Sequence, residues 1–185
     1  KIIICSGYKK EIIENYFKDE KHIQVIDTGL KTQTGARIKN IKKYIGKDEN
    51  FFMTYGDGLS NINLMKLLEF HKKNNKIATL SAVRPIPRFG HLTIEGDKVT
   101  KFKEKDALSE GWINGGFFVL NSKVFEYIND EQDCIFERQP LENLSKDGEL
   151  MAYKHNKFWH PMDTLRDRNL LQSLWLSNNA PWKVW

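Results

Sequence analysis

Two aspartates that each follow an apolar run have the residue type and setting for metal chemistry. Asp57 stands between Gly56 and Gly58 in FFMTYGDGLS, and Asp163 follows the run FWHPM. At the carboxyl ends of strands, such side chains lie where open α/β sheets bind ligands. Mg²⁺ in proteins takes one or two carboxylates together with phosphate oxygens. The pair therefore suggests a magnesium site that faces a phosphorylated substrate.

Both aspartates also have ordinary structural explanations. Asp57 could belong to an Asp-Gly turn or cap the helix that follows it. Asp163 could be the N-cap of a closing helix. The glycines beside Asp57 would permit unusual backbone angles and the close approach of a ligand. The residues alone leave these alternatives open.

A Thr- and Gly-rich segment, TQTGARIKN at residues 32–40, opens a helix. The free N–H groups and positive dipole end of a helix start can bind an anion or a base edge. Arg37, in the first turn, could add a bidentate contact to phosphate. Taken alone, the segment is better explained as a capped helix start with a surface arginine.

Two further segments have features suited to a sugar phosphate. In KFKEKD, the neighbours Glu104 and Lys105 could bind a sugar phosphate together: the carboxylate would accept from sugar hydroxyls, and the ammonium would contact the phosphate. A solvated edge strand guarded by lysines would have the same appearance. In WINGGFFVL, Asn114 and Gly115 suggest a backbone held close to a ligand, and a β-bulge is the alternative.

The elements that must position these residues follow from the apolar pattern. Continuous apolar runs (KIIIC, IQVID, FFMTY, IATLSAV) alternate with helical patterns at residues 9–17, 35–45 and 61–73, the last capped by Ser60 or Asn61. This alternation predicts an α/β fold with a mostly parallel sheet. The second half predicts a β-hairpin around Gly96, a strand at 115–121, short helices at 122–128 and 140–148, a strand at 149–155 and a helix at 164–176.

Length and composition fit an ordinary globular protein. The 185 residues suffice for one domain with a core, and 40% hydrophobic and 29% charged residues are typical values. The net charge of +5 suits anionic ligands, but the lysines are scattered and no basic-aromatic motif predicts nucleic-acid binding. Because no apolar run has membrane length and no signal peptide begins the chain, we expect a cytoplasmic protein without a membrane partner, with Cys5 and Cys134 as buried free thiols.

Taken together, the motifs resemble those of the sugar-1-phosphate nucleotidyltransferases. The matching words include VIDTG, TGARIK, TYGDGL, RFGHLTI, INGGFFVLN, QPLENL and FWHPMDTLRD, and they cover nearly the whole chain. PMDTLRD and INGGFFVLN in combination are specific. The resemblance implies a Rossmann-like nucleotidyltransferase fold with a β-hairpin-rich sugar-binding part. Residues 1–185 would form a single domain that is incomplete at its N-terminus, because the family's glycine-rich L-x-G-G-x-G-T-R-L segment is absent and Lys1 begins directly in a strand.

The resemblance also implies an activity and assigns residues to it. CTP and α-D-glucose 1-phosphate would give CDP-glucose and pyrophosphate with Mg²⁺, for deoxysugars of bacterial surface polysaccharide such as O-antigen. The implied metal ligands are Asp57 and Asp163, which with Lys105 form the catalytic group. The implied nucleotide contacts are Thr32, Thr34, Gly35, Arg37 and Gly56, and the implied sugar-phosphate contacts are Gly90, Glu104, Lys105, Asn114 and Gly115. Family members assemble, and the tail APWKVW would expose two tryptophans to a partner surface, so a homo-oligomer is expected.

Two other functions compete with this one. A glycosyltransferase that uses a nucleotide sugar would share the strand-end carboxylates and Mg²⁺, but it should carry an Asp-x-Asp pair. YGDGLSN has a single aspartate. A non-catalytic sugar-phosphate-binding or assembly module is favoured by the missing glycine-rich segment.

Overall fold

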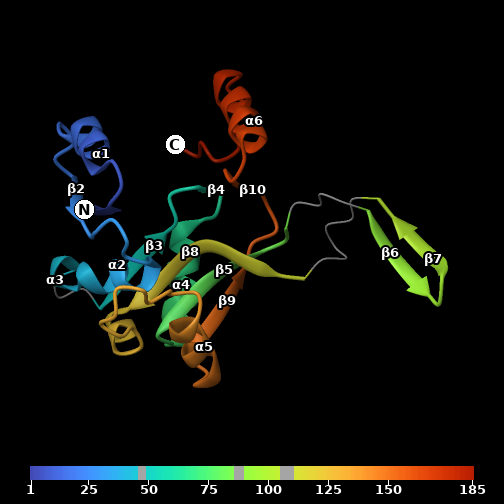
Figure 1. Cartoon of the computed structure of the whole chain (residues 1–185), viewed down its shortest axis with the longest axis horizontal. Coiled ribbons are helices and arrows are strands. Elements are labelled where there is room, and N and C mark those ends of the chain that lie inside the picture. The colour runs from blue at the N-terminus through green and yellow to red at the C-terminus, as the bar shows by residue number, and fades with distance from the viewer. Residues whose placement is uncertain (46–48, 86–89, 105–110) are drawn as a thin grey trace. The chain divides into compact units, whose positions relative to one another are not determined.

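The structure is a computed structural model that describes residues 1–45, 49–85, 90–104 and 111–185 (Figure 1). The chain divides into two compact units. Unit 1 comprises Lys1–Phe51, Lys76–Ala78 and Leu120–Leu150. Unit 2 comprises Phe52–Asn75, Thr79–Val119 and Met151–Trp185.

Unit 1 begins with a strand–helix–strand segment. β1 (Ile2–Ser6) and β2 (Ile23–Asp27) pair in parallel, and α1 (Lys10–Phe17) connects them. The remaining elements lie entirely within this unit and are α2 (Thr34–Asn40), α3 (Lys42–Ile45), the 3₁₀ helix η2 (Ser122–Glu126) and α5 (Gln139–Lys146). The prediction of a single helix over residues 35–45 is therefore wrong, because α2 ends at Asn40 and its C-cap, Ile41, has a φ of −92° and a ψ of 0°.

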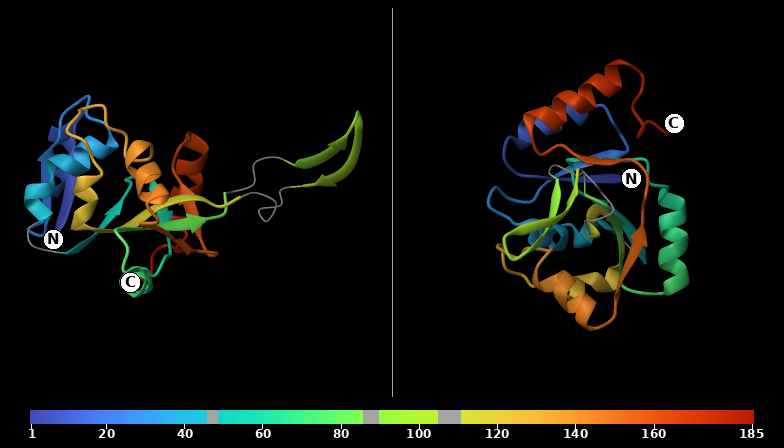
Figure 2. Two further views of the ribbon diagram at one scale, coloured as in Figure 1. Left: turned by 90° about the horizontal axis from the view of Figure 1, so that it is seen from below. Right: turned by 90° about the vertical axis from the view of Figure 1, so that its right-hand side faces the viewer.

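A four-stranded sheet has the order β3 (Asn50–Thr54), β8 (Ile113–Asn121), β5 (Ala78–Val83) and β9 (Leu150–Lys154) (Figures 1 and 2). β5 and β9 run parallel, since Ala78 N–H donates to Glu149 and His155 N–H donates to Ala82. β8 runs antiparallel to β3. At one end Tyr55 N–H donates to the Gly116 carbonyl, and at the other Ser122 N–H donates to the Glu49 carbonyl. The α/β class is confirmed, and β8 makes the sheet mixed.

Unit 2 holds β4 (Gly58–Ser60), α4 (Leu64–Asn74), the hairpin of β6 (His91–Glu95) and β7 (Lys98–Lys103), β10 (Trp159–Pro161) and α6 (Leu165–Leu176). The hairpin turns at Gly96, as predicted. α4 is capped by Asn63, whose side chain accepts from Lys66 N–H at 2.9 Å, and not by Ser60 or Asn61.

Each unit has its own buried residues. In unit 2, Ile62, Leu67 and Val119 form a cluster onto which half-buried apolar side chains pack. In unit 1, Phe136 and Leu144 are completely buried. These side chains supply the apolar burial that drives folding.

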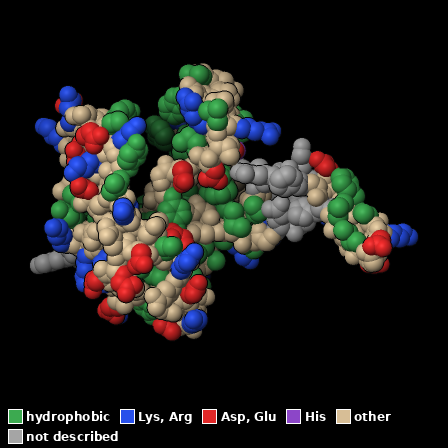
Figure 3. Space-filling view, in the orientation of Figure 1, with side chains coloured by type: hydrophobic (Ala, Val, Ile, Leu, Met, Phe, Trp, Pro, Cys, Tyr) green, Lys and Arg blue, Asp and Glu red, His purple; other side chains and the backbone are tan. Residues whose placement is uncertain are grey.

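The remaining expectations concern cysteines, membranes and charge. Cys134 is buried and Cys5 is half-buried, both are free thiols, and burial raises the pKa of each. None of the helices in the described part of the chain is long and apolar enough to cross a membrane. Acidic and basic side chains are interspersed on the face shown in Figure 3.

Candidate active site

Asp57 and Asp163 flank a short antiparallel ladder, Asp57 directly before β4 and Asp163 two positions after β10. β4 pairs with β10 so that Gly58 lies opposite Pro161. One step further, Met162 N–H donates to the Asp57 carbonyl at 2.8 Å. Both aspartates are exposed to solvent. The pairing therefore brings together the backbone segments that carry the two aspartates, although these lie far apart in the sequence.

The fold uses neither aspartate as a helix cap, and Gly56 and Asp57 lie in a bend between β3 and β4. α4 is capped by Asn63, and α6 is capped by Thr164, which shares a capping box with Asp167. Asp57 leads directly into β4. Within the described residues, neither Asp57 nor Asp163 has a side-chain hydrogen bond or ion pair. Their carboxylates are thus available to a ligand.

The glycines around Asp57 contribute space and not unusual angles. A Cβ built at Gly56 meets nothing within 4 Å, so a ligand can approach the backbone there. The glycines could permit a positive φ beside Asp57, but neither Gly56 nor Gly58 has one. The left-handed glycine nearby is Gly116, with a φ of +77°.

Asn114 and Gly115 are held by residues that flank the two aspartates. Asn114 Nδ2 donates to Tyr55 Oη at 3.3 Å, and Asn114 Oδ1 accepts from Gly116 N–H at 2.9 Å. Trp159 Nε1 donates to the Gly115 carbonyl at 2.8 Å. Since Tyr55 precedes Asp57 by two positions and Trp159 begins β10, the structure brings Asn114 and Gly115 to the segments that carry the aspartates.

Sequence reasoning missed Tyr55 and Trp159. The available signal was a hydrogen-bonding aromatic residue shortly before each aspartate, in TYGD and in FWHPMD. Buried or half-buried Tyr and Trp side chains usually hydrogen-bond through their O–H or N–H group. Tyr55 and Trp159 both bond to the Asn114–Gly115 segment.

His160 supports the segment before Asp163. Its ring is almost fully buried, with Nδ1 at 2.7 Å from the Pro161 carbonyl oxygen and Nε2 at 3.9 Å from Asp167 Oδ1. Asp167 also accepts from the Thr164 hydroxyl at 2.7 Å. The chain on both sides of Asp163 is therefore fixed.

In unit 1, the start of α2 donates its N–H groups to the chain itself. Gly35 N–H donates to the Cys134 carbonyl at 2.9 Å. The Thr34 hydroxyl donates to Glu137 Oε2 at 2.6 Å and accepts from Phe136 N–H at 2.9 Å. These contacts use groups that the sequence suggested for an anion, so a nucleotide role for Thr34 and Gly35 stays a prediction.

Arg37 and Thr32 are likewise engaged within unit 1. Arg37 Nη1 donates to the Ser6 carbonyl at 2.8 Å and to Thr28 Oγ1 at 2.6 Å, which ties the end of β1 to the residue after β2. Thr32 is buried and accepts from Gln132 Nε2 at 3.4 Å. Their proposed contacts with nucleotide also remain predictions.

The candidate sugar residues of the hairpin lie next to each other. Glu104 Oε2 is 3.1 Å from the position that a Cβ at Gly90 would occupy. Lys105, expected to hold the phosphate of the sugar, lies outside the described residues.

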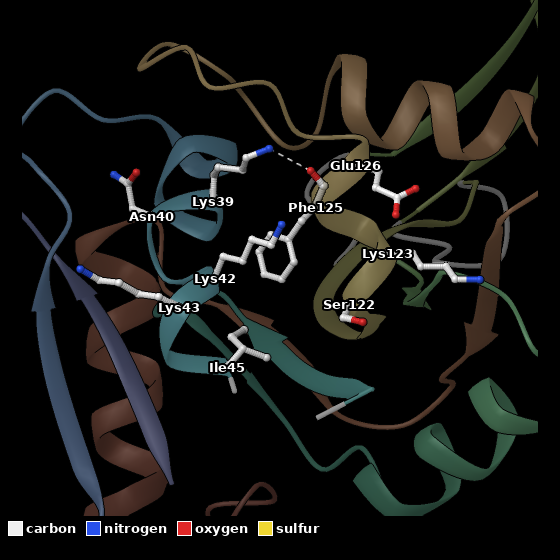
Figure 4. A pocket seen from close by; sticks show the side chains of 9 residues that line it. All are labelled: Lys39, Asn40, Lys42, Lys43, Ile45, Ser122, Lys123, Phe125 and Glu126. Atoms are coloured by element: carbon white, nitrogen blue, oxygen red, sulfur yellow. Dashed lines mark hydrogen bonds between the residues drawn. The ribbon is translucent and has the colours of Figure 1, made fainter. Parts of the chain in front are cut away.

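A basic pocket of about 660 Å³ in unit 1 is lined by none of the predicted residues. Figure 4 shows the Lys43 and Lys123 side chains directed away from each other. Lys39 Nζ donates to the carbonyls of Phe125 and Ile128, so this cation is already satisfied. Such an arrangement does not concentrate charge on one ligand.

Comparison with known proteins yields consistent matches. The family model described as nucleotidyl transferase matches residues 1–167. The chain is 40% identical to the glucose-1-phosphate cytidylyltransferase of Salmonella typhi, over 99% of this chain and 80% of that protein. It is 32% identical to the D-glycero-α-D-manno-heptose 1-phosphate guanylyltransferase of Aneurinibacillus thermoaerophilus, over 76% of this chain and 63% of that protein.

Solved structures match in fold. The inositol-1-phosphate CTP transferase from T. maritima superposes with a TM-score of 0.66 at 13% identity, over 99% of this chain and 78% of that chain. A UDP-glucose pyrophosphorylase complexed with UDP-glucose gives the same TM-score and identity, over 95% of this chain and 80% of that chain.

Proposed function

The chain belongs to the nucleotidyl transferase family, and from that premise we propose that it transfers a cytidylyl group from CTP to α-D-glucose 1-phosphate. The products are CDP-glucose and pyrophosphate. The observation that carries the proposal is the 40% identity, over 99% of this chain, to a glucose-1-phosphate cytidylyltransferase. The pairing of the segments that carry Asp57 and Asp163 supports it.

The reaction needs positioning more than acid–base chemistry. A phosphate oxygen of glucose 1-phosphate forms a bond to the α-phosphorus of CTP, and the bond from that phosphorus to the leaving oxygen breaks. The electron pair departs with pyrophosphate. Because a sugar phosphate is already ionised at neutral pH, no strong base is required, and catalysis rests on alignment and charge stabilisation.

Asp57 and Asp163 fit a magnesium ion. They supply hard oxygen donors from two paired segments, they are exposed, and no described residue occupies their carboxylates. Two carboxylates leave other coordination positions to phosphate oxygens and water, as Mg²⁺ prefers. When bound, Mg²⁺ neutralises charge on the reacting phosphates.

The other proposed contacts divide between the two substrates. Asn114, Gly115, Gly90, Glu104 and Lys105 are proposed for glucose 1-phosphate, with Lys105 holding the attacking phosphate. Gly56, whose surroundings are open, is proposed for the nucleotide. The remaining proposed nucleotide residues are Thr32, Thr34, Gly35 and Arg37.

The test is pyrophosphate release from each of the four nucleoside triphosphates with glucose 1-phosphate and Mg²⁺. We expect release with CTP that requires the sugar phosphate and disappears when EDTA removes the metal. Release without the sugar phosphate would indicate hydrolysis. Calorimetric binding of glucose 1-phosphate without release from any nucleotide would replace the proposal with the non-catalytic binding module.

A further inference from the structure

The side-chain amide of Asn114 is fixed at both of its polar ends. Oδ1 accepts from Gly116 N–H at 2.9 Å, and Nδ2 donates to Tyr55 Oη at 3.3 Å. A flipped amide would direct its NH₂ group at Gly116 N–H, placing donor against donor. The Gly116 contact therefore selects the orientation, and Tyr55 completes it from the opposite side.

The residues that fix this amide are themselves held in place. The Tyr55 ring packs on Gly116, since a Cβ built there would lie 2.6 Å from Tyr55 Cδ2. The same ring meets Phe118 edge to face, with centroids 5.8 Å apart. Because Phe118 is fully buried, the Tyr55 hydroxyl has a rigid support.

The backbone that carries Asn114 is equally confined. A Cβ at Gly115 would lie 2.6 Å from Ser81 Oγ and 2.8 Å from Val83 Cγ1, so the strand is packed closely against β5. On the Gly115 carbonyl, Trp159 Nε1 adds a 2.8 Å hydrogen bond from β10. Asn114 thus has a defined position relative to the strand that leads to Asp163.

A fixed amide can discriminate between arrangements of hydroxyl groups. Asn carries two N–H donors and an oxygen with two lone pairs. With one donor given to Tyr55 and one lone pair to Gly116, one donor and one acceptor remain on a single fixed amide. Neighbouring hydroxyls of a hexose can satisfy both only in a matching relative orientation, and a site with unmatched polar groups rejects the wrong ligand.

We propose that Tyr55 is a positioning residue that holds the Asn114 amide in the orientation selected by Gly116 and thereby helps to determine which hexose 1-phosphate is accepted. The proposal rests on the proposed function, because it assumes that Asn114 contacts the sugar. It adds that selectivity among sugar epimers depends on a tyrosine hydroxyl that need not touch the sugar.

The kinetic test compares Tyr55→Phe with wild type on glucose 1-phosphate and on its epimers galactose 1-phosphate and mannose 1-phosphate. Loss of one hydrogen bond should raise KM for glucose 1-phosphate about 10-fold and leave KM for CTP unchanged. The preference for glucose 1-phosphate over its epimers should fall. Tyr153→Phe, which removes a hydroxyl from another half-buried tyrosine of unit 2, is the matched control.

A double-mutant cycle identifies the route. If Tyr55 acts through Asn114, then Tyr55→Phe should change neither KM nor epimer preference in an Asn114→Ala background. An unchanged effect in that background would show that Tyr55 acts independently, and the proposal would be overturned.

A spectroscopic readout separates this inference from the proposed function. In ¹⁵N-labelled protein without substrate, Tyr55→Phe should shift one Asn114 side-chain N–H resonance and accelerate its exchange with solvent, whereas Tyr153→Phe should not. Identical Asn114 resonances in wild type and Tyr55→Phe would reject the positioning role whatever the activity. If Tyr55→Phe shifts the Asn114 resonance but the wild-type protein makes no CDP-glucose, only the proposed function would be rejected.

Discussion

Asp57 and Asp163 lie on two paired segments, Asp57 directly before β4 and Asp163 two positions after β10. Both aspartates are exposed, and no described residue bonds to either carboxylate. Neither caps a helix, because Asn63 and Thr164 do so. The pair is therefore better explained by binding than by stability.

This argument predicts that Asp57→Asn lowers activity without lowering stability. We expect kcat to fall by about 100-fold or more, as is usual when a group that stabilises transition-state charge is removed. The thermal unfolding midpoint without metal should stay unchanged, because this exposed carboxylate bonds to no described residue of the fold. Asp19→Asn, at another exposed aspartate, is the control for both measurements. Full activity in Asp57→Asn would reject the metal role.

Gly35 and Gly56 provide a second test at the residue level. A Cβ at Gly35 would lie 2.8 Å from Cys134 Sγ and 2.9 Å from the Cys134 carbonyl oxygen, whereas Gly56 is open. Gly35→Ala should therefore lower the unfolding midpoint clearly. Gly56→Ala should leave it nearly unchanged and instead raise KM for CTP. Equal midpoints for the two variants would contradict the packing argument.

Glu149 predicts part of the pH dependence of stability. It accepts from Lys76 Nζ at 3.0 Å and from Ile77 N–H at 3.2 Å, and the Lys76 hydrogen bond holds the pKa of Glu149 below its usual value. Since the unfolded pKa is about 4.3, the stabilisation is complete above that pH and is lost as the pH falls through the lower folded pKa.

The measurement is the difference in unfolding midpoint between wild type and Glu149→Gln at several pH values. The difference should be largest near neutral pH and shrink below about pH 4.3, the unfolded pKa. Glu69→Gln, on an exposed position of α4, should show no such trend. A difference that stays constant with pH would exclude this ion pair as the source.

Among the elements, the long ones followed from sequence and the shortest ones did not. The strands of β1, β2 and β5, the helices α1, α4 and α6 and the hairpin were predicted, because their apolar periods extend over several residues. β4 and β10 each have three residues, too few to show a period. Their pairing also joins segments about 100 positions apart, which no local pattern reveals.

The same distinction holds for the candidate site. Asp57 and Asp163 could be chosen from residue type and setting, and the remaining contacts came from family resemblance. The segments that carry the two aspartates are paired through the β4–β10 ladder, and Tyr55 and Trp159 hold the Asn114–Gly115 segment through strand packing. These are tertiary facts, so only the structure could supply them.

The capping box of α6 predicts a coupling between helix stability and activity. The Thr164 hydroxyl caps the helix directly after Asp163. Thr164→Ala should lower the free energy of unfolding by about 1 kcal/mol and also reduce kcat, because Asp163 loses its support. Gln172→Ala, on an exposed position of the same helix, should change neither. If Thr164→Ala is destabilised but keeps a normal kcat, the helix cap does not support the function of Asp163.

At the scale of the whole molecule, two buried cores share continuous strands. The boundaries between the units fall within β3, β5, β8 and β9. In the tail, Trp182 stacks on Phe158, so the expectation of two exposed tryptophans is wrong and only Trp185 stands open. A homo-oligomer stays a prediction that sedimentation can test.

The shared strands predict a single unfolding transition. Leu67 in unit 2 and Leu144 in unit 1 are both fully buried. Replacing either with Ala should cost about 2–5 kcal/mol and lower the same transition, whereas Leu176→Ala, at an exposed position, should have little effect. Two transitions, each moved by one variant, would show that the units unfold independently.

The hydrogen bond from Trp159 to Gly115 also gives the protein an intrinsic optical reporter. Indole emission responds to the partner of its N–H group and to the polarity around the ring, and this indole is bonded next to Asn114. The chain has five tryptophans. If Asn114 contacts the sugar phosphate as proposed above, a version with phenylalanine at the other four would report sugar-phosphate binding by fluorescence alone, without a dye or a coupled assay.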